Sequence, residues 1–103
     1  TAKNLEASIE GESHEYESMY PGFIRAAEEE KRSDAVLAFT YAMKAEEVHA
    51  GLYKKALAAL RAGNDLGRAA IYLCPVCGNI EIGAAPEKCP ICGVPARMFR
   101  EIQ

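Results

Sequence analysis

The sequence lacks a long hydrophobic segment and an excess of positive charge. Its longest largely apolar stretch, residues 35–43, is far shorter than the ~20 residues of a membrane-spanning helix, and no basic start followed by an apolar middle marks a signal peptide. The net charge is −3, and the Lys and Arg residues are scattered among acids, so no cationic surface for nucleic acid is expected. We therefore expect a cytoplasmic protein without membrane or nucleic-acid partners.

The composition changes near residue 63, which predicts two modules. Residues 5–60 are rich in Ala, Glu, Lys, Leu and Met, which favour helices, whereas Pro, Gly and Cys crowd residues 74–95. Glycines between the two regions indicate a helix end followed by a connector. We predict a mostly α chain, with a helical hairpin over 1–62, a linker over 63–71 and a small β module over 72–103.

The helical part has the pattern of two packed helices. Apolar residues recur at alternating steps of four and three from Leu5 to Ala26, and again from Phe39 to Leu60, which is the spacing of core-facing positions in bundles. A break at residues 31–32 separates the segments, so they should be antiparallel neighbours. Pro21 predicts a kink or a short break in the first segment, because proline lacks a backbone donor.

Two acids occupy core-facing positions of these helices. Glu12 and Glu46 lie among apolar neighbours, where a carboxylate is costly to bury unless it is paired or bound to a metal. Glu15 and His49 follow three residues later, on nearly the same helix faces. The two pairs are equally far from the predicted turn, so an antiparallel hairpin brings them to the same level.

These residues have two interpretations. They could be surface charges at a helix edge, since a single Glu-x-x-His pair often occurs by chance. The sequence favours half of a di-iron site, because di-iron bundles take one Glu from each of two helices and Glu-x-x-His from each of the other two. This hairpin supplies one of each kind, and a second hairpin is needed to complete the site. Glu47 falls off the core-facing positions and is an ordinary solvated charge.

Four cysteines form two matching motifs near the C-terminus. Cys74-Pro-Val-Cys77-Gly and Cys89-Pro-Ile-Cys92-Gly have the spacing of paired metal ligands, and the glycines permit turns that direct backbone amides at the sulfurs. Four thiolates suit one iron or one zinc ion. Two disulfides are disfavoured by the expected compartment and by the spacing. A purely structural zinc ribbon is the more serious alternative.

The combination of motifs resembles the C-terminal portion of the rubrerythrins and of their relative nigerythrin. The resemblance rests on residues 11–21, residues 45–50 and the two cysteine motifs, in that order, and covers essentially the whole chain. It implies half of a ferritin-like bundle followed by a rubredoxin-like Fe(Cys)4 domain. It further implies an NADH-dependent peroxidase that reduces hydrogen peroxide to water in oxidative-stress defence, with electrons supplied by a reductase or a rubredoxin.

Carried over by position, the resemblance implies site residues and a partner. Glu12, Glu15, Glu46 and His49 would be iron ligands, and Tyr20 a hydrogen-bond donor beside them. Rubrerythrins have an N-terminal hairpin with the remaining ligands, whereas this sequence begins where their third helix begins. It is therefore expected to be a fragment or one part of a split protein, a half-length form that forms a homo-oligomer, or a hairpin without di-iron. Because the connector is short, electrons are expected from a neighbouring subunit.

The resemblance leaves one alternative from another functional class. The chain would then be a non-catalytic rubredoxin-like electron carrier, or an interaction module stabilised by zinc in place of iron. In that case the buried acids of the hairpin would bind no metal.

Overall fold

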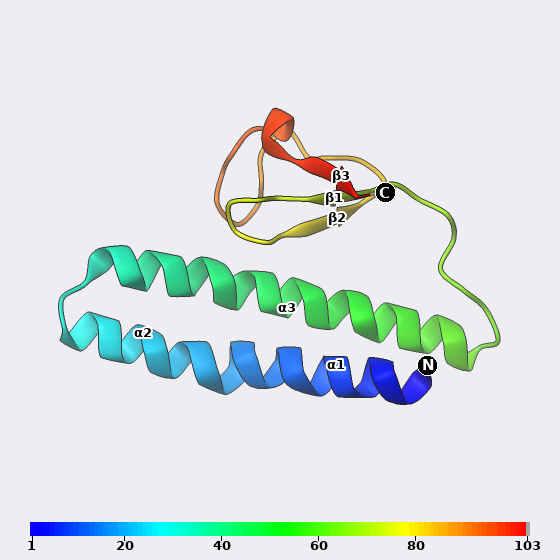
Figure 1. The fold of residues 1–103 in the computed structure, drawn as a ribbon, viewed down its shortest axis with the longest axis horizontal. Helices are drawn as coiled ribbons and strands as arrows, with labels where there is room; N and C mark the ends of the chain where they lie inside the picture. The colour runs from blue at the N-terminus through cyan, green and yellow to red at the C-terminus, as the bar shows by residue number, and fades with distance from the viewer. Residues whose placement is uncertain (103) are drawn as a thin grey trace.

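The computed structural model describes residues 1–102, as a helical hairpin beside a small sheet (Figure 1). The hairpin consists of α1 (Ala2–His14), the π-helical turn η1 (Glu15–Met19), α2 (Tyr20–Glu29) and α3 (Ser33–Arg61). The sheet consists of β1 (Ile71–Leu73), β2 (Ile80–Ile82) and β3 (Arg100–Ile102), with the short 3-10 helix η2 (Ala96–Met98) before β3. The predicted fold class, a mostly α hairpin followed by a small β module, is confirmed.

The helical hairpin reverses at the predicted break. Lys31 has a φ of 56°, in the left-handed region, and the Arg32 N–H donates to the Ala27 carbonyl at 2.9 Å, which closes the end of α2. Arg32 also forms an ion pair of 2.9 Å with Asp34 in the first turn of α3. An acid at this end of a helix interacts favourably with its dipole, so the sequence favours the start of α3 here.

Pro21 does not break the first helical segment. A π-helical turn, Glu15–Met19, ends just before it, and the Tyr20 N–H donates to the Glu15 carbonyl, five residues back. Proline cannot donate to a carbonyl of the preceding turn, and its ring crowds that turn. A widened turn relieves both problems, so α1, η1 and α2 follow one another as a single rod (Figure 1).

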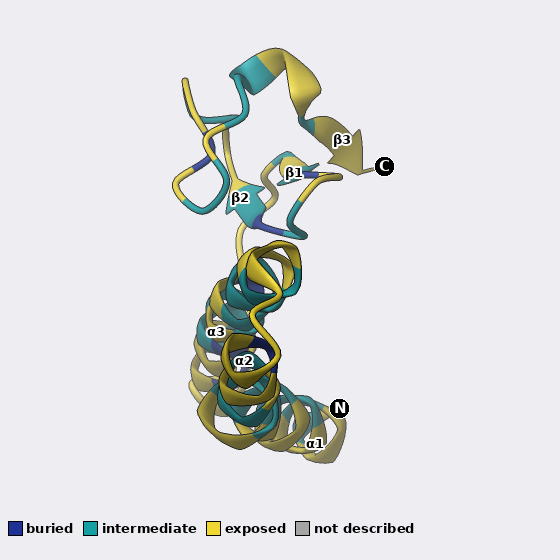
Figure 2. Ribbon diagram, turned by 90° about the vertical axis from the view of Figure 1, so that its left-hand side faces the viewer, coloured by how far each residue is buried: buried dark blue, intermediate teal, exposed yellow. Residues whose placement is uncertain are grey.

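The helices pack through small side chains and leave much of their apolar surface open. Ala27, Ala45, Ala50 and Leu57 are buried in the hairpin, whereas Figure 2 shows most of the helices as intermediate (teal) or exposed (yellow). An aromatic cluster lies near the hairpin turn, with ring centroids 5.4–6.2 Å apart. It is formed by Tyr20, Phe23 and Phe39. The hairpin thus has a narrow core and exposed apolar side chains.

The sheet is antiparallel in the order β2-β1-β3, and it lies over the middle of α3 (Figure 1). Residues 64–70 have no regular secondary structure and lead back from the end of α3. An extended chain spans about 3.3 Å per residue, so this short connector reaches well back along the helix. None of the described helices is long and apolar enough to span a membrane.

Candidate metal centres

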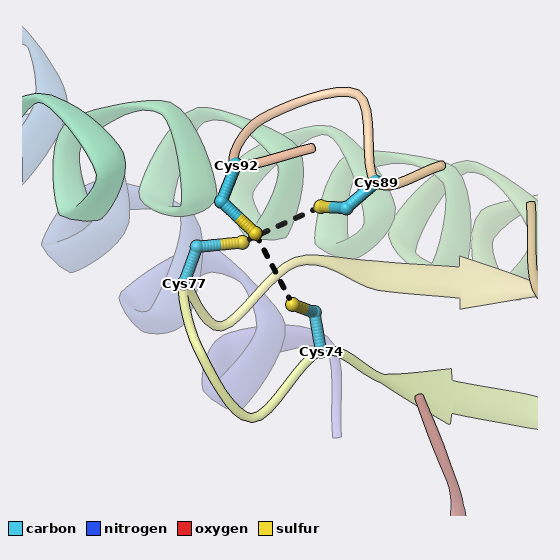
Figure 3. Close-up of side chains that lie close together, drawn as sticks. All are labelled: Cys74, Cys77, Cys89 and Cys92. Carbon is cyan, nitrogen blue, oxygen red and sulfur yellow. Dashed lines mark hydrogen bonds between the residues drawn. The ribbon is translucent and has the colours of Figure 1, made fainter. Parts of the chain in front are cut away.

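The four cysteines converge in one cluster between the two loops that carry the cysteine motifs (Figure 3). Their sulfurs all lie within 4.8 Å of one another, and the Sγ atoms of Cys74 and Cys92, like those of Cys77 and Cys89, are 3.6 Å apart. Cys74 and Cys89 are buried and no disulfide joins any of the four. Four thiols that converge on one point suit a single tetrahedral metal ion such as iron or zinc.

Each cysteine pair is held by a glycine turn. The Gly78 N–H donates to the Cys74 carbonyl and the Gly93 N–H to the Cys89 carbonyl, both at 2.9 Å. The two glycines have φ values of 87° and 81°, which residues with a side chain rarely adopt. The turns therefore explain why each motif ends in glycine, and they bring the paired sulfurs together.

Burial and backbone N–H donors shift the pKa values of the cysteine thiols in opposite directions. Burial raises the pKa of Cys77, and the backbone N–H of Asn79, as a hydrogen-bond donor, only partly offsets this. Burial also acts to raise the pKa of Cys89, but the backbone N–H groups of Cys92 and Ile91 and the neighbouring thiols outweigh it and lower that pKa to about 7. Thiolate is the form that binds metal, so Cys89 is prepared for a metal ion near neutral pH.

A second cluster lies inside the helical hairpin. Glu12 of α1 and Glu46 and His49 of α3 each place one potential ligand atom within 4.8 Å of the others. His49 Nδ1 is 3.3 Å from Glu46 Oε2 and 3.6 Å from Glu12 Oε1. The second carboxylate oxygen of Glu12 is buried and has no hydrogen-bond partner. An unpaired buried carboxylate oxygen is costly, so this cluster needs a cation.

His49 joins the second cluster to the cysteine module. Its Nε2 lies 2.7 Å from the Gly78 carbonyl oxygen. A carbonyl only accepts hydrogen bonds, so Nε2 carries a proton, and Nδ1 on the other side of the ring faces the two carboxylates. With Nδ1 unprotonated, the imidazole and the two carboxylates would offer three ligand atoms to one metal ion, and the Gly78 carbonyl would orient the imidazole through Nε2.

The other predicted residues of this site lie outside the cluster. Glu15 is the first residue of the π turn and follows Glu12 by three residues. Three residues turn a helix by about 300°, so the side chains of Glu12 and Glu15 point about 60° apart around the helix axis. Tyr20 packs against Phe23 and Phe39, with centroids 5.9 and 6.2 Å away. The roles of Glu15 as a ligand and of Tyr20 as a hydrogen-bond donor therefore stay predictions.

The position of the cysteine module differs from the expectation for electron delivery. We expected the module of a neighbouring subunit to approach the acid cluster, because the connector is short. The structure instead places the module against α3 of its own chain, where a Cβ added to Gly78 would lie 3.7 Å from Ala45 Cβ. The connector is extended and runs back along α3, which a length argument alone does not reveal.

Comparisons with known proteins match both parts of the chain. Residues 1–57 match the family model for rubrerythrin, and residues 72–100 match the model for the rubredoxin-like domain of rubrerythrin. Nigerythrin of Nitratidesulfovibrio vulgaris is 46% identical over 93% of this chain and 46% of its own length. Rubrerythrin-2 of Clostridium acetobutylicum is 37% identical over 94% of this chain and 53% of its own.

Solved structures of nigerythrin also match this chain. A mixed-valence state of nigerythrin superposes with a TM-score of 0.88 at 42% identity, over 98% of this chain and 49% of that one. A fully reduced, all-ferrous state of nigerythrin gives the same score and identity over 98% and 48%. The chain thus spans about half the length of the relatives it matches. The match of more than half of the chain to the rubrerythrin model, together with the four-cysteine module that follows, shows that this chain belongs to the rubrerythrin family.

Proposed function

We propose that this chain is part of a non-haem di-iron peroxidase, an oxidoreductase that reduces hydrogen peroxide to water with electrons supplied through its cysteine-bound iron. The observation that carries the proposal is the contact between His49 Nε2 and the Gly78 carbonyl, which connects the two clusters within one chain. Membership of the rubrerythrin family supports an iron-centred redox role. A tetrathiolate site also suits a reducing compartment such as the cytoplasm.

The acid cluster is the proposed place of peroxide reduction. Glu12, Glu46 and His49 would hold iron, with Glu15 and ligands from a second hairpin completing the site. Iron bound there would supply the two electrons that, with two protons, convert one hydrogen peroxide into two water molecules. The two carboxylates would offset the positive charge of the metal, and the Gly78 carbonyl would keep the His49 proton on Nε2.

One peptide group forms the proposed connection between the clusters. The carbonyl of the Gly78–Asn79 peptide accepts a hydrogen bond from His49 Nε2, and its N–H donates toward the thiol of Cys77. A cysteine ligand and a histidine of the acid cluster are thus joined by a single peptide with a hydrogen bond at each end. This arrangement suits transfer of one electron at a time from the cysteine-bound iron.

A second helical hairpin is the proposed structural partner. Phe23, Tyr53 and Leu60 are 43%, 37% and 37% exposed, although all three occupy core-facing positions in the sequence pattern. A homo-oligomer or a complementing N-terminal hairpin would cover them and supply the missing iron ligands. Sedimentation should accordingly show a species larger than one chain, and a stable monomer at micromolar concentration would contradict this part of the proposal.

The iron content and colour of the protein test the redox role. When isolated aerobically from iron-replete cells, the protein should be red, because ferric tetrathiolate sites have charge-transfer bands in the visible region. These bands should bleach when the cysteine-bound iron of each chain takes up one electron. A colourless protein that holds one zinc per chain under these conditions would favour the alternative of a zinc-stabilised interaction module.

A further inference from the structure

Asn79 stands out because its polar side chain is fully buried. It is 1% exposed and is the only polar or charged residue of the buried class among residues 1–102. Its Nδ2 donates to Glu81 Oε1 at 3.0 Å, and Glu81 lies half-buried on β2. Burial of an amide costs free energy that a hydrogen bond at best offsets, so an apolar residue would be the simpler choice at this position.

The second cysteine motif has an apolar residue at the matching position. Val94 follows Cys92-Gly93 as Asn79 follows Cys77-Gly78. The carbonyl of Val94 accepts the N–H of Cys89 at 2.8 Å, and the carbonyl of Asn79 accepts the N–H of the corresponding cysteine at 2.9 Å. The backbone N–H of each also donates toward the thiol two residues before it. A valine at this position thus makes the same backbone contacts. The geometry of the metal site therefore does not explain why residue 79 has an amide side chain.

The two motifs differ in what lies against them. The motif with Asn79 rests on α3, where the Gly78 carbonyl accepts from His49 Nε2 and Gly78 lies close to Ala45. Gly93, at the matching place in the other motif, is exposed. The buried amide therefore occurs at the motif whose peptide has hydrogen bonds at both ends.

We infer that Asn79, anchored to Glu81, is a positioning residue that fixes the Gly78–Asn79 peptide between the Cys77 sulfur and His49 Nε2. Rotation of this peptide would break both of its hydrogen bonds and would carry the Asn79 amide away from the Glu81 carboxylate. A valine has no such anchor. A role of this peptide in electron transfer rests on the proposed function. The anchoring of the peptide by Asn79 does not.

Hydrogen exchange in the assembled, zinc-loaded protein tests the inference without redox chemistry. Asn79→Val should leave zinc binding intact, because Val94 serves the same backbone role. The backbone N–H of residue 79 and the Nε2–H of His49 should then exchange about tenfold faster, as expected for loss of a hydrogen bond to a charged group. The backbone N–H of Val94 should keep its exchange rate, and NMR resolves all three protons.

Substitutions of the anchor provide the controls. Glu81→Gln keeps an acceptor for Asn79 and should retain protection, whereas Glu81→Val should behave like Asn79→Val. Glu81 and Glu101 lie in the same row of the sheet, because each pairs with Tyr72. Glu101 is exposed, so Glu101→Val should leave the exchange rates unchanged. Unchanged exchange at residue 79 in Asn79→Val would overturn the inference. Equal acceleration at residues 79 and 94 would also overturn it, by showing general destabilisation.

The outcomes separate this inference from the proposed function. If peroxide is not reduced but the exchange pattern is as expected, the anchoring by Asn79 stands and the peroxidase assignment fails. If peroxide is reduced and the exchange at residue 79 is unaffected, the peroxidase stands and Asn79 is merely a buried side chain.

Discussion

Replacement of Glu46 or His49 by alanine is expected to slow peroxide-driven oxidation of the cysteine-bound iron by more than about a hundredfold. Both residues belong to the cluster with Glu12, and loss of even an outer partner of a metal ligand typically costs 10–100-fold in affinity or activity. The visible spectrum should stay largely intact, because all four cysteine ligands of that iron are retained. Stopped-flow absorbance of the assembled, reduced protein after mixing with peroxide measures the rate.

Glu47→Ala is the matched control for this prediction. Glu47 is adjacent to Glu46 on α3 but is exposed and is not part of the cluster. Its replacement should change the rate little. An equal rate in all three variants and the unsubstituted protein would show that the hairpin acids do not take part, and would leave an electron carrier as the better interpretation.

Replacement of Cys77 or Cys89 by serine should unfold the C-terminal module. A module this small has little apolar core, and its sulfur cluster provides much of its folding free energy once a metal is bound, on the order of 10 kcal/mol in comparable zinc peptides. Amide protection over residues 71–102 should be lost, whereas the helical circular dichroism of the hairpin should persist.

Val76→Ala is the control for the cysteine variants. Val76 lies within the first motif, between Cys74 and Cys77, and is 53% exposed. It should retain the metal and the protected amides. A Cys77→Ser protein that still shows the protection pattern of the unsubstituted module would mean that the sheet folds without a complete metal site, which would contradict the account.

Much of the architecture was predictable because it depends on local patterns. The alternating four and three spacing predicted two helices, and the break at residues 31–32 predicted the reversal now seen at Lys31. The repeated Cys-x-x-Cys-Gly motif predicted a common metal site because few other structures need that spacing. Glu12, Glu46 and His49 were recognisable as a group because charge at core-facing positions requires an explanation.

Features that depend on tertiary contacts were not predictable. Pro21 indicated an irregular helix, but whether the chain breaks or widens into a π turn depends on how both ends of the rod pack against α3. The place of the cysteine module depends on the direction of an extended connector, which composition does not encode. Asn79 has no distinguishing signal in the sequence, and only its burial and its contact with Glu81 set it apart from Val94.

The most direct test of the central claim is an anaerobic titration of the fully reduced, iron-loaded assembly with hydrogen peroxide. The thiolate-to-iron band and the remaining peroxide are followed together. The account predicts that the band returns as peroxide is added, and that one peroxide is consumed for every two electrons lost by the protein, without release of dioxygen. Peroxide that stays unconsumed, or a band that returns no faster than in His49→Ala, would contradict the claim that the two clusters form one redox unit.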